Sequence, residues 1–219
     1  CTPGMAAALV GKDGRRQTIR KSVVSESGIK APVDGSVQLE IVDEGKSFSD
    51  VSAGWAAEAA AYVSGRGLFQ TSGADEFDGG APMSRGALAQ VLYELEGCPA
   101  PGAPAGFSDV KDSEYADAVA WASEAGLMSG YGDGRFGVED TLTREQAAVI
   151  FWRYADSPAP IRGVLDFTDA GRISGYAGQA MRWAVENGVL SGRGGGVLDP
   201  GGKITRLEAA KLLLNFMSM

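Results

Sequence analysis

Phe107-Ser108-Asp109-Val110, Ser129-Gly130-Tyr131-Gly132-Asp133-Gly134-Arg135-Phe136 and Thr143-Arg144-Glu145-Gln146 follow one another in the middle of this chain, and related segments occur on both sides. The first segment recurs as Phe48-Ser49-Asp50 and as Phe167-Thr168-Asp169, at distances of 59 and 60 residues. In each copy a glycine precedes an arginine by 18 residues, and the pairs are Gly67 and Arg85, Gly126 and Arg144, and Gly188 and Arg206. Such fixed offsets indicate a tandem repeat whose units share a core.

Each copy is predicted to form a helix, a long Gly-rich loop and a second helix. In the middle copy, apolar residues recur at i, i+3 and i+4 in the first helix (Ala118, Trp121, Ala122) and at i, i+3, i+4 and i+7 in the second (Ala147, Ile150, Phe151, Tyr154). This spacing gives each helix one apolar face. We expect the units to span residues 46–100, 105–157 and 164–219, with Pro- and Gly-rich linkers at 99–106 and 158–163.

Residues 1–45 have a different pattern. Residues 17–24 and 36–42 alternate with a period close to two, and Gly11-Lys12-Asp13-Gly14 is a turn signal. We expect two or three short strands here. A lone hairpin is only marginally stable, so this β segment is expected to pack on the repeats or to be the tail of an upstream domain.

Composition excludes several classes of function. The net charge of −8 disfavours nucleic-acid binding, and the absence of His removes the commonest metal ligand and general base. No apolar run is long enough for a membrane span, and neither a metal, a cofactor nor a catalytic residue is predicted. Two cysteines, Cys1 and Cys98, are too few for a disulfide framework, so we expect free thiols, with a lipidated Cys1 as the alternative. Without an initiator Met, the chain is expected to be a processed product or a fragment.

The second helix of two repeats begins with a capping box. Thr143 and Thr205 are each followed three residues later by a residue with a side-chain amide or carboxylate, Gln146 and Glu208. Capping explains these residues but not the arginine at the first helical position, where the helix dipole disfavours a cation. Two explanations remain open. One is an anion held by free N–H groups and a guanidinium, and the other is a structural ion pair to the aspartate of the repeat, Asp50, Asp109 or Asp169.

The ordered set of motifs resembles three S-layer homology (SLH) domains, over residues 48–219. The resemblance implies a mainly α fold in which three helix-loop-helix repeats form a pseudo-threefold bundle, here preceded by a short β segment. It also implies grooves between the repeats that bind a secondary cell-wall polysaccharide linked to peptidoglycan. The terminal sugar of that polymer often carries a pyruvate ketal, whose carboxylate would be the anion.

The resemblance also implies which residues contact the glycan. The basic motif of the family falls on a hydroxyl residue followed by an arginine, the groove aromatic falls near the start of the first helix, and the Gly-x-Gly loop falls in repeats two and three. The residues concerned are Ser84, Arg85, Thr143, Arg144, Thr205, Arg206, Trp55, Tyr115, Tyr176, Gly132, Gly134 and Gly194. An aromatic ring suits the apolar face of a sugar, and glycine permits close backbone approach to a ligand, although core packing and tight turns are the alternative explanations.

Repeat one departs from the family pattern. Gly86 and Ala87 follow Arg85, so no capping box forms, and the loop of this repeat, Ser72-Gly73-Ala74-Asp75, is followed by Asp78. We expect a frayed helix start here, because Gly disfavours helix by about 0.5–1 kcal/mol relative to Ala. We also expect Asp75 and Asp78 to repel a carboxylate. The site of repeat one is therefore predicted to be the weakest of the three.

The resulting prediction is a non-catalytic, extracellular module that anchors a surface protein to the cell wall or S-layer through its polysaccharide. One alternative is a protein-interaction or self-assembly module, in which the arginines form structural ion pairs. Another is that the chain is the anchor of a surface hydrolase or adhesin whose functional domain lies elsewhere.

Overall fold

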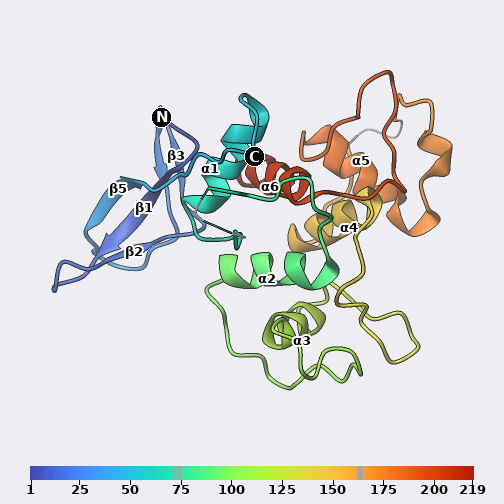
Figure 1. Cartoon of the computed structure of the whole chain (residues 1–219), viewed down its shortest axis with the longest axis horizontal. Helices are drawn as coiled ribbons and strands as arrows, with labels where there is room; N and C mark the ends of the chain where they lie inside the picture. Colours follow the sequence, from blue (N-terminus) through green and yellow to red (C-terminus); the bar gives the residue numbers. More distant parts are fainter. Residues whose placement is uncertain (72, 74, 162–164) are drawn as a thin grey trace.

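A computed structural model describes residues 1–71, 73, 75–161 and 165–219. Ser72 and Ala74 of the first loop, Arg162 and Gly163 of the second linker, and Val164, the expected first residue of the third repeat, lie outside the described residues. The fold is mainly α, with a small sheet at the N-terminal end (Figure 1).

The N-terminal segment forms five short strands rather than two or three. β1 (Met5–Val10) is the central strand of an antiparallel sheet, between β2 (Arg16–Thr18) and β5 (Leu39–Asp43). β3 (Val23–Ser25) and β4 (Gly28–Lys30) form a separate hairpin. Ala8 pairs with Thr18 on one side and Glu40 on the other. The predicted segments overlap β2, β3 and β5, and the apolar Ala8-Leu9-Val10 before the turn belongs to β1. The alternating pattern does not extend to the start of β1, because its Ala6-Ala7-Ala8 run is fully buried.

The β segment packs on repeat one through a buried arginine. Arg66, which follows the first helix, α1 (Trp55–Ser64), is 3% exposed and stacks on the ring of Tyr62, with its guanidinium carbon 3.8 Å from the ring centroid. The same guanidinium donates to the backbone carbonyls of Pro3, Met5 and Ser22. This confirms that the segment packs on the repeats, because an arginine of repeat one supplies hydrogen-bond donors to its backbone.

In the described residues, six α-helices form the repeats, two in each. The first helices are α1 (Trp55–Ser64), α3 (Ala116–Glu124) and α5 (Gly178–Glu186), and the second helices are α2 (Arg85–Leu95), α4 (Arg144–Tyr154) and α6 (Arg206–Met217). Two short 3-10 helices, η1 (Ala170–Arg172) and η2 (Gly175–Ala177), precede α5. Each second helix begins at its arginine, as the sequence predicts.

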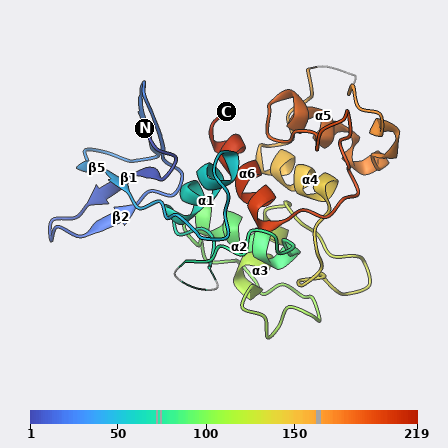
Figure 2. The same ribbon diagram turned by 45° about the horizontal axis from the view of Figure 1, so that its top comes forward.

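The helices pair across the repeat boundaries. α3 packs on α2 and α5 packs on α4, so each first helix contacts the second helix of the preceding repeat. α1 and α6, which lie far apart in the sequence, pack on each other in the same way (Figures 1 and 2). All three repeats contribute to one apolar core, which includes Phe77, Phe136 and Leu198, all fully buried. The shared core predicted from the repeat pattern is therefore confirmed.

Three backbone segments meet where the second helices begin. Met83 donates its N–H to the carbonyl of Ile204, Ile204 donates to Leu142, and Leu142 donates to Met83, at 2.9, 3.1 and 3.0 Å. All three side chains are buried. Each residue comes from a different repeat, so this hydrogen-bond cycle joins the three repeats at their centre.

Candidate functional site

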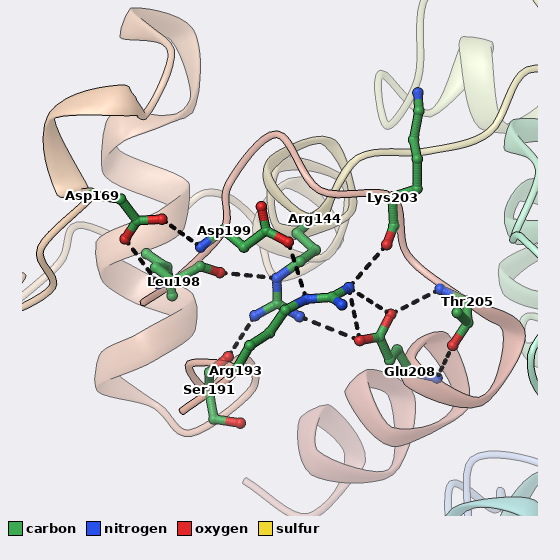
Figure 3. A network of polar contacts seen from close by, with 9 residues as sticks. All are labelled: Arg144, Asp169, Ser191, Arg193, Leu198, Asp199, Lys203, Thr205 and Glu208. Atoms are coloured by element: carbon green, nitrogen blue, oxygen red, sulfur yellow. Dashed lines mark hydrogen bonds and ion pairs between the residues drawn. The ribbon is translucent and has the colours of Figure 1, made fainter. Parts of the chain in front are cut away.

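The three arginines at the helix starts hold the neighbouring repeat. Arg144 donates from Nε to the carbonyl of Leu198 at 3.0 Å and from Nη2 to that of Ser191 at 2.5 Å (Figure 3). Arg85 makes the same pair of bonds to Phe136 and Ser129. Arg206 makes them to Phe77 and Gln70 of the first repeat. Each guanidinium thus clamps a loop of the next repeat in the cycle.

These clamps leave one nitrogen of each guanidinium, Nη1, unused by the two carbonyls. Nη1 of Arg144 lies 3.9 Å from a carboxylate oxygen of Glu208 (Figure 3). Within the described part of the chain, Nη1 of Arg85 and Nη1 of Arg206 donate no hydrogen bond. Burial lowers the pKa of all three groups, but an arginine stays protonated at neutral pH. Each therefore keeps a charged donor edge.

An anion held by free N–H groups at the helix start, one of the two explanations offered by the sequence, is wrong. The first two N–H groups of α4 donate to the carbonyls of Gly202 and Pro200, and the third donates to the hydroxyl of Thr143. The starts of α2 and α6 are satisfied in the same way by the neighbouring repeat and by their caps. An anion at this place could therefore accept hydrogen bonds only from the part of the guanidinium that the carbonyls do not use.

The aspartates of the alternative explanation have other partners. The carboxylate of Asp109 accepts the backbone N–H groups of Phe136, Gly137 and Val138, at 2.7–3.1 Å. Asp50 and Asp169 hold the equivalent backbone in their own repeats. Within the described residues, no salt bridge joins these aspartates to the three arginines. The aspartates shape the loops whose carbonyls the arginines clamp.

Each arginine lines a separate groove, and each groove takes residues from all three repeats. The Arg85 groove includes Ser129, Arg153 and Tyr176, and has a volume of about 190 Å³. The Arg144 groove, about 600 Å³, includes the loop of repeat three, α6 and Trp55. The Arg206 groove, about 320 Å³, includes the loop of repeat one, α2 and Tyr115. Equivalent positions of the repeats thus build all three grooves.

The structure brings the three aromatic residues together with the three arginines, one in each groove. Trp55 is 50% exposed and Tyr176 is 60% exposed, which is unusual for large rings in this protein. The hydroxyl of Tyr176 donates to the buried carboxylate of Glu145 at 3.2 Å. Burial, followed by the negative charge of Glu145, raises the pKa of Tyr176. Exposed, fixed rings of this kind offer an apolar face to a ligand.

The remaining residues proposed from the sequence lie elsewhere. The hydroxyls of Ser84, Thr143 and Thr205 cap their helices, and the capping boxes of α4 and α6 are confirmed. The described residues that line the three grooves do not include these caps, and they do not include Gly132, Gly134 or Gly194. The glycines have positive φ angles of 85°, 86° and 96°, with open space where a Cβ would be. Turn geometry accounts for them, and a glycan contact by these six residues stays a prediction.

The acidic loop of repeat one does not accompany Arg85. Asp78 lines the Arg206 groove, because each arginine faces the loop of the next repeat and not that of its own. Asp75 lines none of the three grooves formed by the described residues, and its carbonyl accepts a bond from Ser49. The expectation of an acidic site around Arg85 is therefore wrong, and the acidic character belongs to the groove of Arg206.

Gly86 also has a different explanation from the one expected. A Cβ at this position would lie 2.5 Å from Tyr115 and 2.6 Å from Val138. The residue is buried, and Ser84 still caps the helix through the N–H of Ala87 at 3.1 Å. Close packing on the groove aromatic requires glycine here, so the residue does not indicate a frayed helix start.

Sequence reasoning missed several charged groove residues. Arg153 lines the Arg85 groove, Arg193 and Lys211 line the Arg144 groove, and Glu94 and Glu114 line the Arg206 groove. A signal for part of this set exists in the sequence. Glu94, Arg153 and Asn215 all lie nine residues after the arginine of their repeat, on the helix turn that faces a groove.

The structure gives no support for a metal site, a disulfide or a membrane span among the described residues. The structure places no group of three or more His, Cys, Asp or Glu residues where they could hold a metal ion, in the part of the chain that it describes. Cys1 and Cys98 are both exposed free thiols. In the same described residues, each helix is too short or too polar to cross a membrane.

The sequence matches the S-layer homology domain in three places, at residues 47–89, 106–148 and 166–210. The chain belongs to the S-layer homology domain family. Its three S-layer homology segments contain all three groove arginines, Arg85, Arg144 and Arg206. No enzyme family is indicated.

Proteins with related sequences are surface proteins by name. The chain is 34% identical over 106 residues to "Surface-layer 125 kDa protein" of Lysinibacillus sphaericus, covering 48% of this chain and 9% of that protein. It is 29% identical over 123 residues to "S-layer protein" of Bacillus licheniformis, covering 55% of this chain and 14% of the relative. It is 32% identical over 93 residues to "Cell surface glycoprotein 1" of Acetivibrio thermocellus, covering 42% and 4%. The chain thus spans a small part of these relatives, and they indicate a location at the cell surface, associated with the cell wall.

Proposed function

We propose that this chain is a non-catalytic module that anchors a surface protein by binding a secondary cell-wall polysaccharide linked to peptidoglycan. The ligand is a sugar unit that bears a carboxylate, such as a pyruvate ketal. One observation carries the proposal, namely that each of three grooves combines the charged edge of an arginine with an exposed or half-buried aromatic ring. A guanidinium fits a carboxylate, and a ring fits the apolar face of a sugar.

We infer further that the three repeats form a pseudo-threefold bundle around the Met83, Leu142 and Ile204 cycle. Two observations support this. The helix pairs are equivalent at the three junctions, and so are the arginine clamps. The division into repeats at 46–100, 105–157 and 164–219 stays a prediction, as does the use of each groove.

The test is a pull-down of the purified chain with cell-wall sacculi, before and after acid removes the polysaccharide. Binding is expected only to the untreated sacculi. The double variant Trp55→Ala and Tyr176→Ala removes the two exposed rings and keeps the packed Tyr115, so it should remain folded and bind much less. Ile161→Ala, which removes a 90% exposed apolar side chain outside the grooves, is the control and should bind like the parent.

The arginines themselves are poor first targets. Arg144→Ala would also remove two hydrogen bonds to repeat three, so lost binding and lost folding would coincide. Equal binding to intact and stripped sacculi would instead favour the alternative, a protein-interaction or self-assembly module. In that case, the concentration dependence of the molecular mass in solution would reveal self-association.

A further inference from the structure

The three grooves differ in charge at equivalent positions. Nine residues after its arginine, each repeat places a helix residue in a groove, and this residue is Glu94 in the Arg206 groove, Arg153 in the Arg85 groove and Asn215 in the Arg144 groove. The residue before the groove aromatic also differs. It is Glu114 before Tyr115, but glycine before Tyr176 and before Trp55.

The Arg206 groove has a negative balance. Asp78, Glu94 and Glu114 line it, against the single charge of Arg206. The guanidinium of Arg206 binds the carbonyls of Gln70 and Phe77 just as Arg85 and Arg144 bind theirs, so the acidic lining is what distinguishes this groove. A carboxylate entering this groove would meet one cation and three like charges, and like charges oppose binding at short range.

The other two grooves have a positive balance. Arg85 and Arg153 line the first with no acidic residue, and the nearby Glu145 is occupied by Ser174 and Tyr176. Arg144, Arg193 and Lys211 line the second with one acid, Glu208. Arg193 pairs with Glu208 at 2.9 Å and with Asp199 at 3.2 Å (Figure 3), and Lys211 lies 3.9 Å from Glu58. Neither Asp199 nor Glu58 lines the groove, whose lining keeps three cations against one acid.

We propose that only the Arg85 and Arg144 grooves accept a carboxylate-bearing sugar, and that Glu94 and Glu114 make the Arg206 groove reject it. This inference rests on the proposed function and adds specificity to it. The Arg206 groove then takes only sugar units without a carboxylate. The module then has two sites for the carboxylate-bearing sugar. The helix position nine residues after each arginine, occupied by Glu94, Arg153 or Asn215, determines which grooves accept it.

Calorimetric titration with a pyruvylated N-acetylhexosamine tests this directly. The parent is expected to bind two equivalents, and the same sugar without the ketal should bind at least tenfold more weakly in those two grooves. Glu94→Gln combined with Glu114→Gln should raise the stoichiometry to three. Arg153→Glu, which gives the Arg85 groove the charge found at Glu94, should lower it to one, and Arg153→Gln should weaken that site without inverting its charge.

The controls separate local charge from net charge. Glu26→Gln combined with Asp34→Asn removes two acids from exposed positions outside the three grooves, and should leave two sites. Thermal melts should show that every variant is folded. Three equivalent sites in the parent, or no gain in the Glu94 and Glu114 variant, would overturn this inference while leaving the proposed function intact. No binding to any folded variant would overturn both.

Discussion

At the scale of single residues, the arginines join neighbouring repeats, and the proposed contact with a ligand would use a part of the side chain that those bonds leave free. Nε and Nη2 of Arg85 and Arg144 bind carbonyls of the next repeat, and Nη1 takes no part in these bonds. The planar fork of arginine has separate edges, so a scaffold bond and a ligand bond need not compete. The sequence indicated that these arginines have a specific role, because the helix dipole disfavours a cation at a helix start. The sequence could not identify the carbonyl partners, because every residue has a backbone carbonyl and the ones bound lie 44–54 residues after the arginine.

The aspartates that bind the loop backbone make the free energy of unfolding depend on pH. Burial alone would raise the pKa of Asp109, but hydrogen bonds from Phe136, Val138 and Gly137 outweigh it and lower the pKa below its ordinary value of 3.8. A carboxyl with a lowered folded-state pKa stabilises the fold above its unfolded pKa, and this contribution is lost as the pH falls through the folded-state value. We therefore expect Asp109→Asn to be clearly less stable than the parent near neutral pH, by a margin that narrows below about pH 3.

Urea unfolding of both proteins at the two pH values measures this margin. Asp34→Asn, at an exposed position of the β segment, is the control and should match the parent at both. A margin for Asp109→Asn that is the same at both pH values would show that the charge of the carboxylate contributes nothing.

At the scale of elements, the starts of the second helices were predictable, and the strands were predictable only in part. Capping boxes and apolar spacing are local signals, and they located the first residues of α4 and α6. The strands β3 and β4 have only three residues each, too few to display a period. Gly86 illustrates the same limit. A glycine is needed there because Tyr115 and Val138 leave no room for a Cβ, and these residues approach Gly86 only in the folded chain.

Gly86 gives a prediction with a matched control. In an isolated helix, Gly→Ala gains about 1 kcal/mol. Gly86→Ala should instead destabilise the protein by about 1–3 kcal/mol, because its methyl group would lie within 2.6 Å of two side chains. Gly178→Ala, at the first position of α5 with φ −57° and only Arg182 within 4 Å, should be neutral or stabilising. Chemical denaturation decides the matter, and equal gains for both variants would contradict the packing argument.

At the scale of the whole molecule, a chain of repeats is held together by contacts between its two ends. α6 packs on α1, Arg206 clamps the loop of repeat one, and Met83 donates to Ile204. The shared core was predictable from the repeat spacing. The pairing across repeats was not, because an apolar face does not specify which partner covers it. Because each arginine contacts the loop of the next repeat, the residues predicted for the site of repeat one lie in two grooves. Arg85 lines one of them and Asp78 lines the other.

Removal of residues 164–219 should therefore abolish cooperative unfolding of the remainder. α1 would lose its helix partner, and Arg144 would lose both carbonyls, so two apolar faces and a buried cation would be left exposed. Circular dichroism during heating is the measurement. A control that lacks only Ser218 and Met219 should melt like the parent. A sharp transition of the truncated chain close to that of the parent would mean that the repeats fold independently.

The hydrogen-bond cycle of Met83, Leu142 and Ile204 also determines copy number. Each member gives one N–H and takes one on its carbonyl, so the cycle is complete with three members and leaves no donor or acceptor over. An open array of repeats, as in a solenoid, always exposes an end to which another copy can add. Here a fourth copy would have to break an existing junction before making a new one. Under the proposed function, we expect a protein with more anchoring capacity to carry a second complete set of three repeats, so that the number of binding sites increases in steps of whole modules.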